Sequence, residues 1–255
     1  MERGSDRRAT SRFSKRVENY VRFRPGYPDE ILACLAKEAG LTAACTIADI
    51  GSGTGMLAKK FLLHGNTVYG VEPNDEMRAA AERLLQGYSG FHSLKGTAEG
   101  TTLSTGSIDL IVAGQAFHWF DPDQARAEFI RILRPGGRVA LMWNTRKTDT
   151  TLFLREYERL LQIFSIDYAR VDHRNITEEI LGRFFHGFQK RVFPNMQQFD
   201  FEGLAGRLHS SSYAPLPDHP NFEPMMSELR RIFREHEIGG MVRFDYETEL
   251  YFGQL

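Results

Sequence analysis

The sequence predicts an α/β fold, in which a doubly wound and mostly parallel sheet is covered by helices on both faces. Two observations support this prediction. Short apolar runs alternate with amphipathic helical segments through the first half of the chain, as is typical of βαβ units. A glycine-rich turn also separates the first of these strands from the helix that follows it. We expect seven strands, an antiparallel strand that closes the sheet, and an N-terminal helical lid.

The composition fits a folded protein of this kind and excludes several other classes. The 255 residues are 42% hydrophobic and 25% charged, close to the average of globular proteins. No apolar run approaches the roughly 20 residues that span a bilayer, and no secretory signal is present, so we expect a cytoplasmic protein without membrane contact. The net charge of −1 gives no general attraction to nucleic acid. Cys34 and Cys45 form no metal-binding or redox motif, and we expect no metal site.

The N-terminal segment is basic and amphipathic. Its apolar residues at helical spacing are Phe13, Val17, Tyr20 and Val21. This spacing predicts a helix, and the Arg-Pro-Gly-Tyr-Pro run from Arg24 to Pro28 predicts a bend after it. We therefore assign residues 1–27 to a lid segment and residues 28–255 to the main domain.

Strands and helices alternate between residues 29 and 143. A first helix runs from Asp29 to Ala39 and ends at a glycine. The expected strands are 46–50, 67–71, 108–113 and 138–143, with one more before Gly96. The expected helices are 56–64, 75–85 and 122–133, the last one capped by Asp121 and followed by a turn at 134–137. This order predicts a parallel sheet covered by helices.

The pattern changes after Thr145. The remaining helices are expected at 152–164, 178–188, 201–208 and 222–236, and the remaining strands at 191–199 and 244–252. Apolar and polar residues alternate along 244–252, which predicts the antiparallel closing strand.

The glycine-rich turn, Ile47–Gly55, joins the first strand of this series to a helix. Glycine lets the backbone approach a ligand closely and leaves amide groups exposed at the start of the next helix. The turn therefore predicts a nucleotide-like ligand at the carboxyl ends of the strands. Met56 stands where the fingerprint of NAD and FAD proteins has glycine or alanine, which disfavours a dinucleotide. An ordinary strand-to-helix turn is the alternative.

Glu72 follows the next strand, about 20 residues after the glycine turn. A carboxylate at this place accepts hydrogen bonds from both ribose hydroxyls of a nucleoside. The alternative is a solvated acid at a helix start, since Pro73, Asn74 and Asp75 provide capping groups. The spacing from the glycine turn favours the ribose role.

These motifs resemble those of the class I S-adenosylmethionine-dependent methyltransferases, a family with a Rossmann-like fold. The signature residues are Asp49, Gly51, Gly53, Gly55 and Glu72, supported by the segments 96–99 and 133–137. Within the class, the chain is most similar to small-molecule enzymes of the type that includes trans-aconitate methyltransferase. These often carry a Tyr…Arg-Pro-x-Tyr-Pro segment, matched here by Tyr20, Arg24, Pro25, Tyr27 and Pro28.

The resemblance implies S-adenosylmethionine as the cofactor. The residues that it assigns to cofactor binding are Asp49, Gly51, Ser52, Gly53, Glu72, Pro73, Asn74, Met77, Thr97, Ala98, Glu99, Gln115 and Ala116. The glycine turn would face the methionyl part, Asp49 would reach its amino group through water, and Glu72 would hold the ribose. Residues 73–77 and 97–99 would surround the adenine. The family commonly has aspartate at the position of Thr97, which leaves that contact open.

The resemblance also places an acceptor pocket after the fourth strand. The residues assigned to it are Tyr20, Arg24, Tyr27 and Trp119, with helical elements from 146–240. His118 is a candidate general base, although a single histidine is more often structural. Arg24 would pair with an acidic acceptor, or with a local acid such as Asp29.

The implied function is transfer of a methyl group to a small-molecule acceptor, with a carboxylate as one acceptor class. One alternative is a noncatalytic protein that only binds S-adenosylmethionine. Another is a nucleic-acid methyltransferase that uses the basic N-terminus, although the Asn/Asp-Pro-Pro-Tyr/Phe motif of base-methylating enzymes is missing. The sequence does not indicate an oligomeric state.

Overall fold

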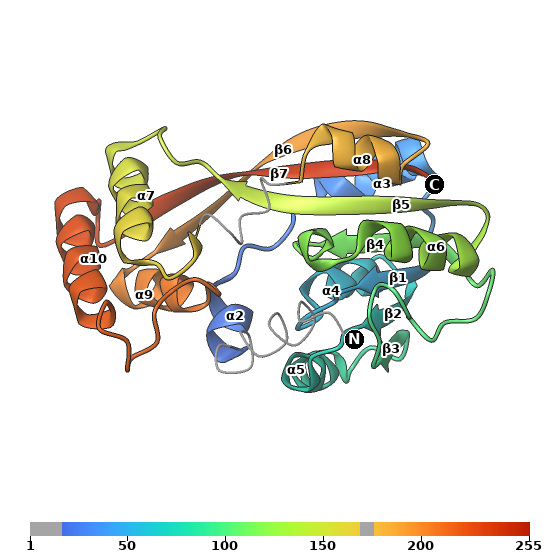
Figure 1. The fold of residues 1–255 in the computed structure, drawn as a ribbon, viewed down its shortest axis with the longest axis horizontal. Coiled ribbons are helices and arrows are strands. Elements are labelled where there is room, and N and C mark those ends of the chain that lie inside the picture. The colour runs from blue at the N-terminus through green and yellow to red at the C-terminus, as the bar shows by residue number, and fades with distance from the viewer. Residues whose placement is uncertain (1–16, 169–175) are drawn as a thin grey trace.

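The computed structural model describes residues 17–168 and 176–255. It is built on a seven-stranded sheet with the strand order β3-β2-β1-β4-β5-β7-β6 (Figure 1). The strands are β1 (Thr46–Ile50), β2 (Thr67–Val71), β3 (Phe91–Leu94), β4 (Ile108–Gly114), β5 (Leu133–Arg146), β6 (Gly187–Phe199) and β7 (Val242–Gln254). Neighbouring strands from β3 to β5 pair in parallel, whereas β7 is antiparallel to both β5 and β6. The predicted α/β fold and its antiparallel strand are confirmed.

Helices cover both faces of this sheet. They are α3 (Glu30–Ala39), α4 (Met56–Leu63), α5 (Asp75–Leu85), α6 (Pro122–Ile132) and α8 (Glu178–Phe184). Phe61 of α4 lies in the core on one face, and Phe129 of α6 lies in the core on the other. Neighbouring residues of β1 point to opposite faces, so Ile47 joins the first core and Ala48 the second. Among the described residues, no helix is long and apolar enough to cross a membrane.

Three further helices form a separate group at one end of the molecule. They are α7 (Leu152–Phe164), α9 (Phe201–His209) and α10 (Phe222–His236). Figure 1 shows β6 and β7 extending from the main sheet into this group. Phe244 of β7 is fully buried there against Phe153 and Tyr157 of α7, with ring centroids 5.2 and 4.9 Å away. The long strands thus hold the helical group beside the carboxyl ends of the parallel strands.

The sheet has its topological switch point between β1 and β4. The chain adds β2 and β3 on one side of β1 and then returns to add β4 and β5 on the other. Connections from β1 and β4 therefore leave the sheet in opposite directions, which opens a crevice at their carboxyl ends. The glycine turn after β1 and the segment after Gly114 border this crevice.

The N-terminal helix α2 (Val17–Phe23) packs against α9 and reaches α5. Phe23 fits over Gly206 of α9, where any Cβ atom would overlap the phenyl ring. No residue of α2 is fully buried, so Phe23 and its neighbours are only partly covered. Phe13, which the sequence pattern placed in the same helix, lies outside the described residues.

The bend after α2 is fixed by a buried asparagine on β5. The Asn144 amide group donates hydrogen bonds to the carbonyls of Pro25 and Gly26, at 3.3 and 3.1 Å. Its own oxygen accepts hydrogen bonds from Asn195 and Thr248, at 3.0 and 2.6 Å. The segment between α2 and α3 is therefore attached to three strands of the sheet.

Two predicted boundaries were wrong. Residues 134–137, expected to be a turn after a helix that ends at Leu133, lie in β5, because Leu133 already pairs with Ile108 of β4. The helix expected at 178–188 ends at Phe184, because Gly187 pairs with Gln254 and starts β6. In both places, strand pairing over a long sequence separation overrides the local pattern.

We predict that Gly206→Ala weakens the attachment of α2. Alanine in a helix interior is normally about 1 kcal/mol more favourable than glycine. At this position the added methyl group would displace the Phe23 ring, so we expect a lower melting temperature and faster amide hydrogen exchange across Val17–Phe23.

The control is Gly182→Ala in α8, where a Cβ atom meets no other atom within 4 Å. This variant should keep or raise the melting temperature. Equal stabilisation by both substitutions would show that the Phe23 contact does not hold α2.

Candidate active site

Two adjoining cavities lie at the carboxyl ends of the parallel strands. Including its mouth, the first offers about 800 Å³ and the second about 520 Å³, within the size range of small-molecule sites. Both are lined by Tyr20, Gly51, Gly53, Gly114 and Gln115. The first is also lined by Glu72, Pro73, Asn74, Met77, Thr97, Ala98, Glu99, Ala116, Trp119 and Phe120. The second is also lined by Arg24, Pro25, Tyr27, Asp49, Ser52, Thr54, Met56, Leu57, Asn144 and Arg207.

The structure brings together nearly all of the residues that the sequence assigned to a site. The thirteen candidate cofactor residues all line one cavity or the other, with Asp49 and Ser52 in the second. The candidate acceptor residues Arg24 and Tyr27 line the second cavity, and Trp119 lines the first. Their roles in binding stay predictions.

The glycine turn owes its shape to left-handed backbone conformations. Gly51, Gly53 and Gly55 have φ angles of 67°, 55° and 80°, in the region that other residues enter at a cost. A Cβ atom at Gly51 would lie 2.7 Å from the Ala116 Cβ. A Cβ atom at Gly53 would meet nothing within 4 Å, because Gly53 faces open cavity. The turn thus packs closely against Ala116 at Gly51 and borders the open cavity at Gly53.

Glu72 holds this turn against the end of β2. One carboxylate oxygen accepts a hydrogen bond from the Gly53 backbone N–H at 2.8 Å, and the other accepts one from the Asn74 N–H at 2.9 Å. The side chain is buried at 8% exposure, and burial raises its pKa while these two amide contacts oppose the rise. Each oxygen keeps a second lone pair for a ligand, so the structure is compatible with ribose binding.

Asp49 lies at the end of β1, beside the N-terminus of α4. It is 1% exposed, and its Oδ2 atom is buried without a hydrogen-bond partner. Burial raises its pKa to about 7, opposed by a hydrogen bond from the Ala58 backbone N–H and assisted by the charge of Glu72. An unpartnered buried carboxylate oxygen is costly unless a ligand supplies a donor or a positive charge.

The segment after β4 is held in a strained turn. Gln115 has a φ angle of 57°, which is uncommon for a residue with a side chain. Its N–H bonds the Met142 carbonyl at 2.9 Å and its side chain donates to the Asn144 carbonyl at 3.1 Å, so both contacts fix it to β5. This turn carries Ala116 against the glycine loop and marks the boundary between the two cavities.

His118, the candidate general base, lies next to the site but outside the lining of the two cavities. It lies beside the Trp119 ring, with centroids 5.0 Å apart. Phe117 is fully buried between Trp143 and Phe184, as expected of a core residue. The catalytic role of His118 stays a prediction.

Comparison with known proteins agrees with this geometry. Residues 48–141 match the family model described as "Methyltransferase domain". An uncharacterized methyltransferase of Geobacillus kaustophilus is 33% identical over 193 residues, which cover 69% of this chain and 86% of that protein. The chain belongs to the S-adenosylmethionine-dependent methyltransferases. The cofactor of this methyltransferase family is S-adenosylmethionine.

Other relatives differ in how much of the chain they match. An uncharacterized methyltransferase of Mycobacterium tuberculosis is 40% identical over 138 residues, and this chain spans about half of its length, 52%. A candidate type II methyltransferase from Anaeromyxobacter dehalogenans has the same fold, with a TM-score of 0.67 and 21% identity over 91% of this chain and 98% of the other.

The site of this methyltransferase fits the cofactor on two observations. The space at Gly53, which a Cβ would fill, leaves room for a ligand against the backbone of the glycine turn. The orphaned Asp49 Oδ2 suits a ligand ammonium group, such as that of a methionyl moiety.

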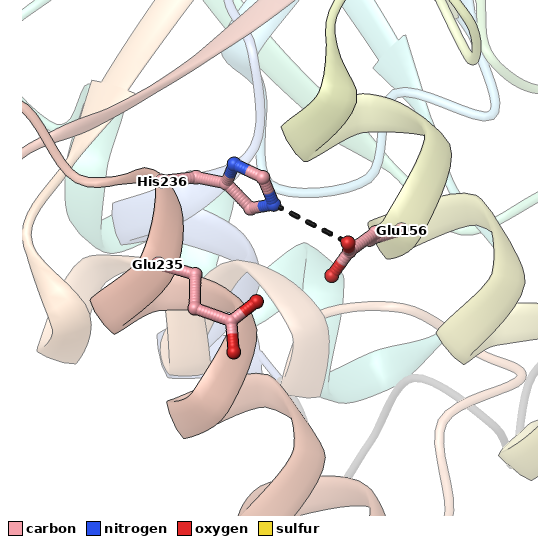
Figure 2. A group of neighbouring side chains, drawn as sticks. All are labelled: Glu156, Glu235 and His236. Atoms are coloured by element: carbon pink, nitrogen blue, oxygen red, sulfur yellow. Dashed lines mark ion pairs between the residues drawn. The ribbon is translucent and has the colours of Figure 1, made fainter.

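A separate acidic cluster joins α7 to α10 rather than forming part of this site. Figure 2 shows Glu156 on α7 facing Glu235 and His236 on α10, with the imidazole 3.5 Å from the Glu156 carboxylate. The Arg231 guanidinium already pairs with Glu156 at 2.8 Å and with Glu235 at 2.5 Å. The two carboxylates thus share one arginine, which also pairs with Glu228 at 2.7 Å, and the cluster connects the helices as an ion-pair network.

Sequence reasoning missed several lining residues of this methyltransferase. Gly114 is one of them, because it lines both cavities. A Cβ atom at this position would overlap the Tyr27 hydroxyl. Phe120 is another, since it lines the first cavity while also packing against the core. Asn144 and Arg207 reach the second cavity from β5 and α9, and no local motif marks either of them.

We predict that Glu72→Gln weakens binding of S-adenosylhomocysteine by about 10- to 150-fold, the value of one charged hydrogen bond. An amide NH₂ group would face one of the two backbone N–H donors, and the charged acceptor for the ribose would be lost. Isothermal titration calorimetry measures the affinity.

Gly53→Ala tests the other half of this site. Its methyl group meets no protein atom, so the variant should fold with only the strain of a positive φ angle, about 1–2 kcal/mol. Binding should nevertheless fall, because the methyl group occupies the ligand space. Wild-type affinity in both folded variants would place the cofactor elsewhere.

Proposed function

We propose that the protein transfers the methyl group of S-adenosylmethionine to a small-molecule acceptor, and that carboxylate-bearing molecules are the acceptor class. The main support is the pair of adjoining cavities that meet at Gly51 and Gln115. The first carries the residues suited to a nucleoside. The second brings an acceptor next to the same glycine turn, where a methyl group would be transferred.

The proposed reaction needs little catalytic machinery. Bound S-adenosylmethionine supplies a methyl group that its sulfonium charge has already activated. An acceptor oxygen forms the new C–O bond while the C–S bond breaks toward sulfur, and a carboxylate acceptor releases no proton. The protein therefore has to align the reactants and exclude water. This agrees with the position of His118, which lines neither cavity.

The lid supports a small acceptor rather than a nucleic acid. Tyr20 on α2 lines both cavities, and Arg24 and Tyr27 continue over the second. Burial raises the pKa of Tyr27 well above its ordinary value, so its phenol stays neutral. Because α2 and the bend after it line these cavities, we propose that residues 17–27, the described part of the lid segment 1–27, act as a lid over a bound small molecule.

We predict that S-adenosylhomocysteine binds with micromolar affinity, about −8.2 kcal/mol, and that NAD binds far more weakly. At about 100 times the dissociation constant, the ligand should add about 2.7 kcal/mol to the free energy of unfolding. Calorimetry and thermal melting test this. A larger thermal shift from NAD than from S-adenosylhomocysteine would contradict the proposal. Binding without turnover across a panel of acceptors would favour a noncatalytic binding protein.

We also predict that affinity for S-adenosylhomocysteine depends on pH through Asp49. Its pKa of about 7 lies above the ordinary 3.8, so the folded protein without ligand holds this proton until the pH rises through 7. A ligand ammonium group favours the charged carboxylate, so binding must release the proton below pH 7. Affinity should therefore fall by up to tenfold for each pH unit from 7 down to 5.

The control for this prediction is Asp49→Asn, which cannot titrate. Its affinity should be weaker but constant over the same range. Calorimetry in buffers of different ionisation enthalpy counts the released protons directly. A pH dependence that persists in the variant would assign it to another group.

A further inference from the structure

Arg207 is a buried cation that has no role in the reaction proposed above. It lies in the last turn of α9, is 6% exposed and lines the second cavity. Its Nε donates to the Tyr246 hydroxyl at 3.2 Å, and one terminal nitrogen donates to the Ser211 hydroxyl at 3.0 Å. Both partners are neutral, so the positive charge is held in place but not compensated.

Arg24 brings a second guanidinium to the same cavity. Its Nη2 donates to the Ser210 carbonyl at 3.0 Å, and the group lies 5.1 Å from the centre of the Tyr20 ring. Its Nε is buried without a partner. Burial and the charge of Arg207 both lower the pKa of Arg24, which places the two cations close enough to repel each other. Both stay protonated at neutral pH, as guanidinium groups do.

Neither cation has an acidic partner in the described part of the chain. No carboxylate of residues 17–168 or 176–255 lies within 4.0 Å of either guanidinium. Asp29, the local acid that the sequence offered to Arg24, pairs instead with Lys60 at 2.5 Å. Asp49 lines the same cavity, but it contacts neither arginine.

Arg146 provides a comparison, because it is a buried arginine that is paired with a carboxylate of the same helical group. Its side chain is 9% exposed, about as buried as Arg207, and it pairs directly with Glu158. Tyr168 donates a further hydrogen bond to that carboxylate at 2.8 Å. Buried charges are expensive unless they are paired, and among the described residues neither Arg207 nor Arg24 has such a partner.

We propose that Arg207 and Arg24 together bind an anionic group of the acceptor, and that this group is separate from the atom that receives the methyl. This inference rests on the proposed function and narrows its acceptor class. Arg207 retains an unassigned terminal nitrogen, and Arg24 retains unassigned N–H groups, for a carboxylate. Charge-assisted hydrogen bonds of this kind are about twice as strong as neutral ones.

The separation of the two groups follows from the chemistry. A carboxylate held by two guanidinium groups gives up electron density to its donors and becomes a poorer nucleophile. The cations would therefore slow attack by the group that they bind, but they would position a second group on the same molecule. The acceptor class is thus a small molecule with an anionic anchor and a distinct nucleophile, such as a dicarboxylate.

The methionyl carboxylate of the cofactor is the other source of the same chemistry. Gly51 and Ser52 line the second cavity together with Arg207, so a cofactor carboxylate would lie in reach of this region. The two sources predict different responses. An arginine that binds the cofactor controls its affinity, whereas an arginine that binds the acceptor does not.

The experiment measures succinate binding to protein saturated with S-adenosylhomocysteine, at constant ionic strength, with the uncharged succinamide as the comparison ligand. We expect succinate to bind the wild type about 10- to 150-fold more tightly than succinamide. Arg207→Met and Arg24→Met should each remove most of this preference. Arg207→Lys keeps the charge and should retain part of it. Equal binding of the two ligands by the wild type would overturn the inference.

The matched control is Arg230→Met, which removes the same charge from an exposed position over the Phe201 ring, outside both cavities. It should keep the preference for succinate. An equal loss in this variant would reduce the effect to general electrostatics and overturn the inference. Without ligand, Arg207→Met should melt no lower than the wild type, because it removes an uncompensated charge, whereas Arg146→Met should melt lower because Glu158 is left unpaired.

A third arm compares S-adenosylhomocysteine with 5′-methylthioadenosine, which lacks the methionyl carboxylate. We expect Arg207→Met to bind both as the wild type does. Loss of affinity for S-adenosylhomocysteine alone would assign Arg207 to the cofactor and overturn the inference, while leaving the proposed function intact. No binding of S-adenosylhomocysteine to the wild type would instead overturn the proposed function.

Discussion

The Glu72 carboxylate accepts one hydrogen bond from Gly53 and another from Asn74, and these two bonds join the turn after β1 to the turn after β2. The Val71 carbonyl adds to this connection, because it accepts hydrogen bonds from the Gly51 and Ser52 N–H groups at 2.8 and 3.2 Å. Since Glu72 is buried, water cannot readily replace its contacts. The left-handed glycines are thus held in place before any ligand arrives, and a ligand meets a preformed surface.

A second constraint places the residues of the second cavity. The backbone of the bend after α2 contains Pro25, which has no N–H group, and its carbonyls need donors once they are covered. Asn144 and Asn195 supply these donors, and Thr248 orients Asn144 by donating to its oxygen. A buried polar network of this kind is stable only when every member is satisfied. It therefore fixes the bend that lies between Arg24 and Tyr27.

The sequence was informative where function depends on local chain geometry. The glycine turn and Glu72 lie within one βαβ unit, so the spacing of their motifs could locate them. Arg207 could not be found in this way, because it reaches the cavity from α9, far along the chain from the glycine turn. The Arg24–Ser210 hydrogen bond beside it joins residues that are 186 positions apart. The predicted end of α8 was wrong for a related reason. Apolar residues continue past Phe184, and only pairing with Gln254 decides that they enter β6.

The buried cation and the lid are also connected by a chain of hydrogen bonds. Arg207 donates to Tyr246, Tyr246 donates to Gln197 at 3.1 Å, and Gln197 donates to the Phe23 carbonyl at the end of α2 at 3.1 Å. Separation of α2 from α9 would break this chain and the contact between Arg24 and Ser210, and it would let water reach the two guanidinium groups. In the lid that we propose, solvation of the cations would therefore favour the open state, and an anion between them would favour the closed state. A ligand shifts such an equilibrium only through its different affinities for the two states, and a negative charge at this place supplies that difference.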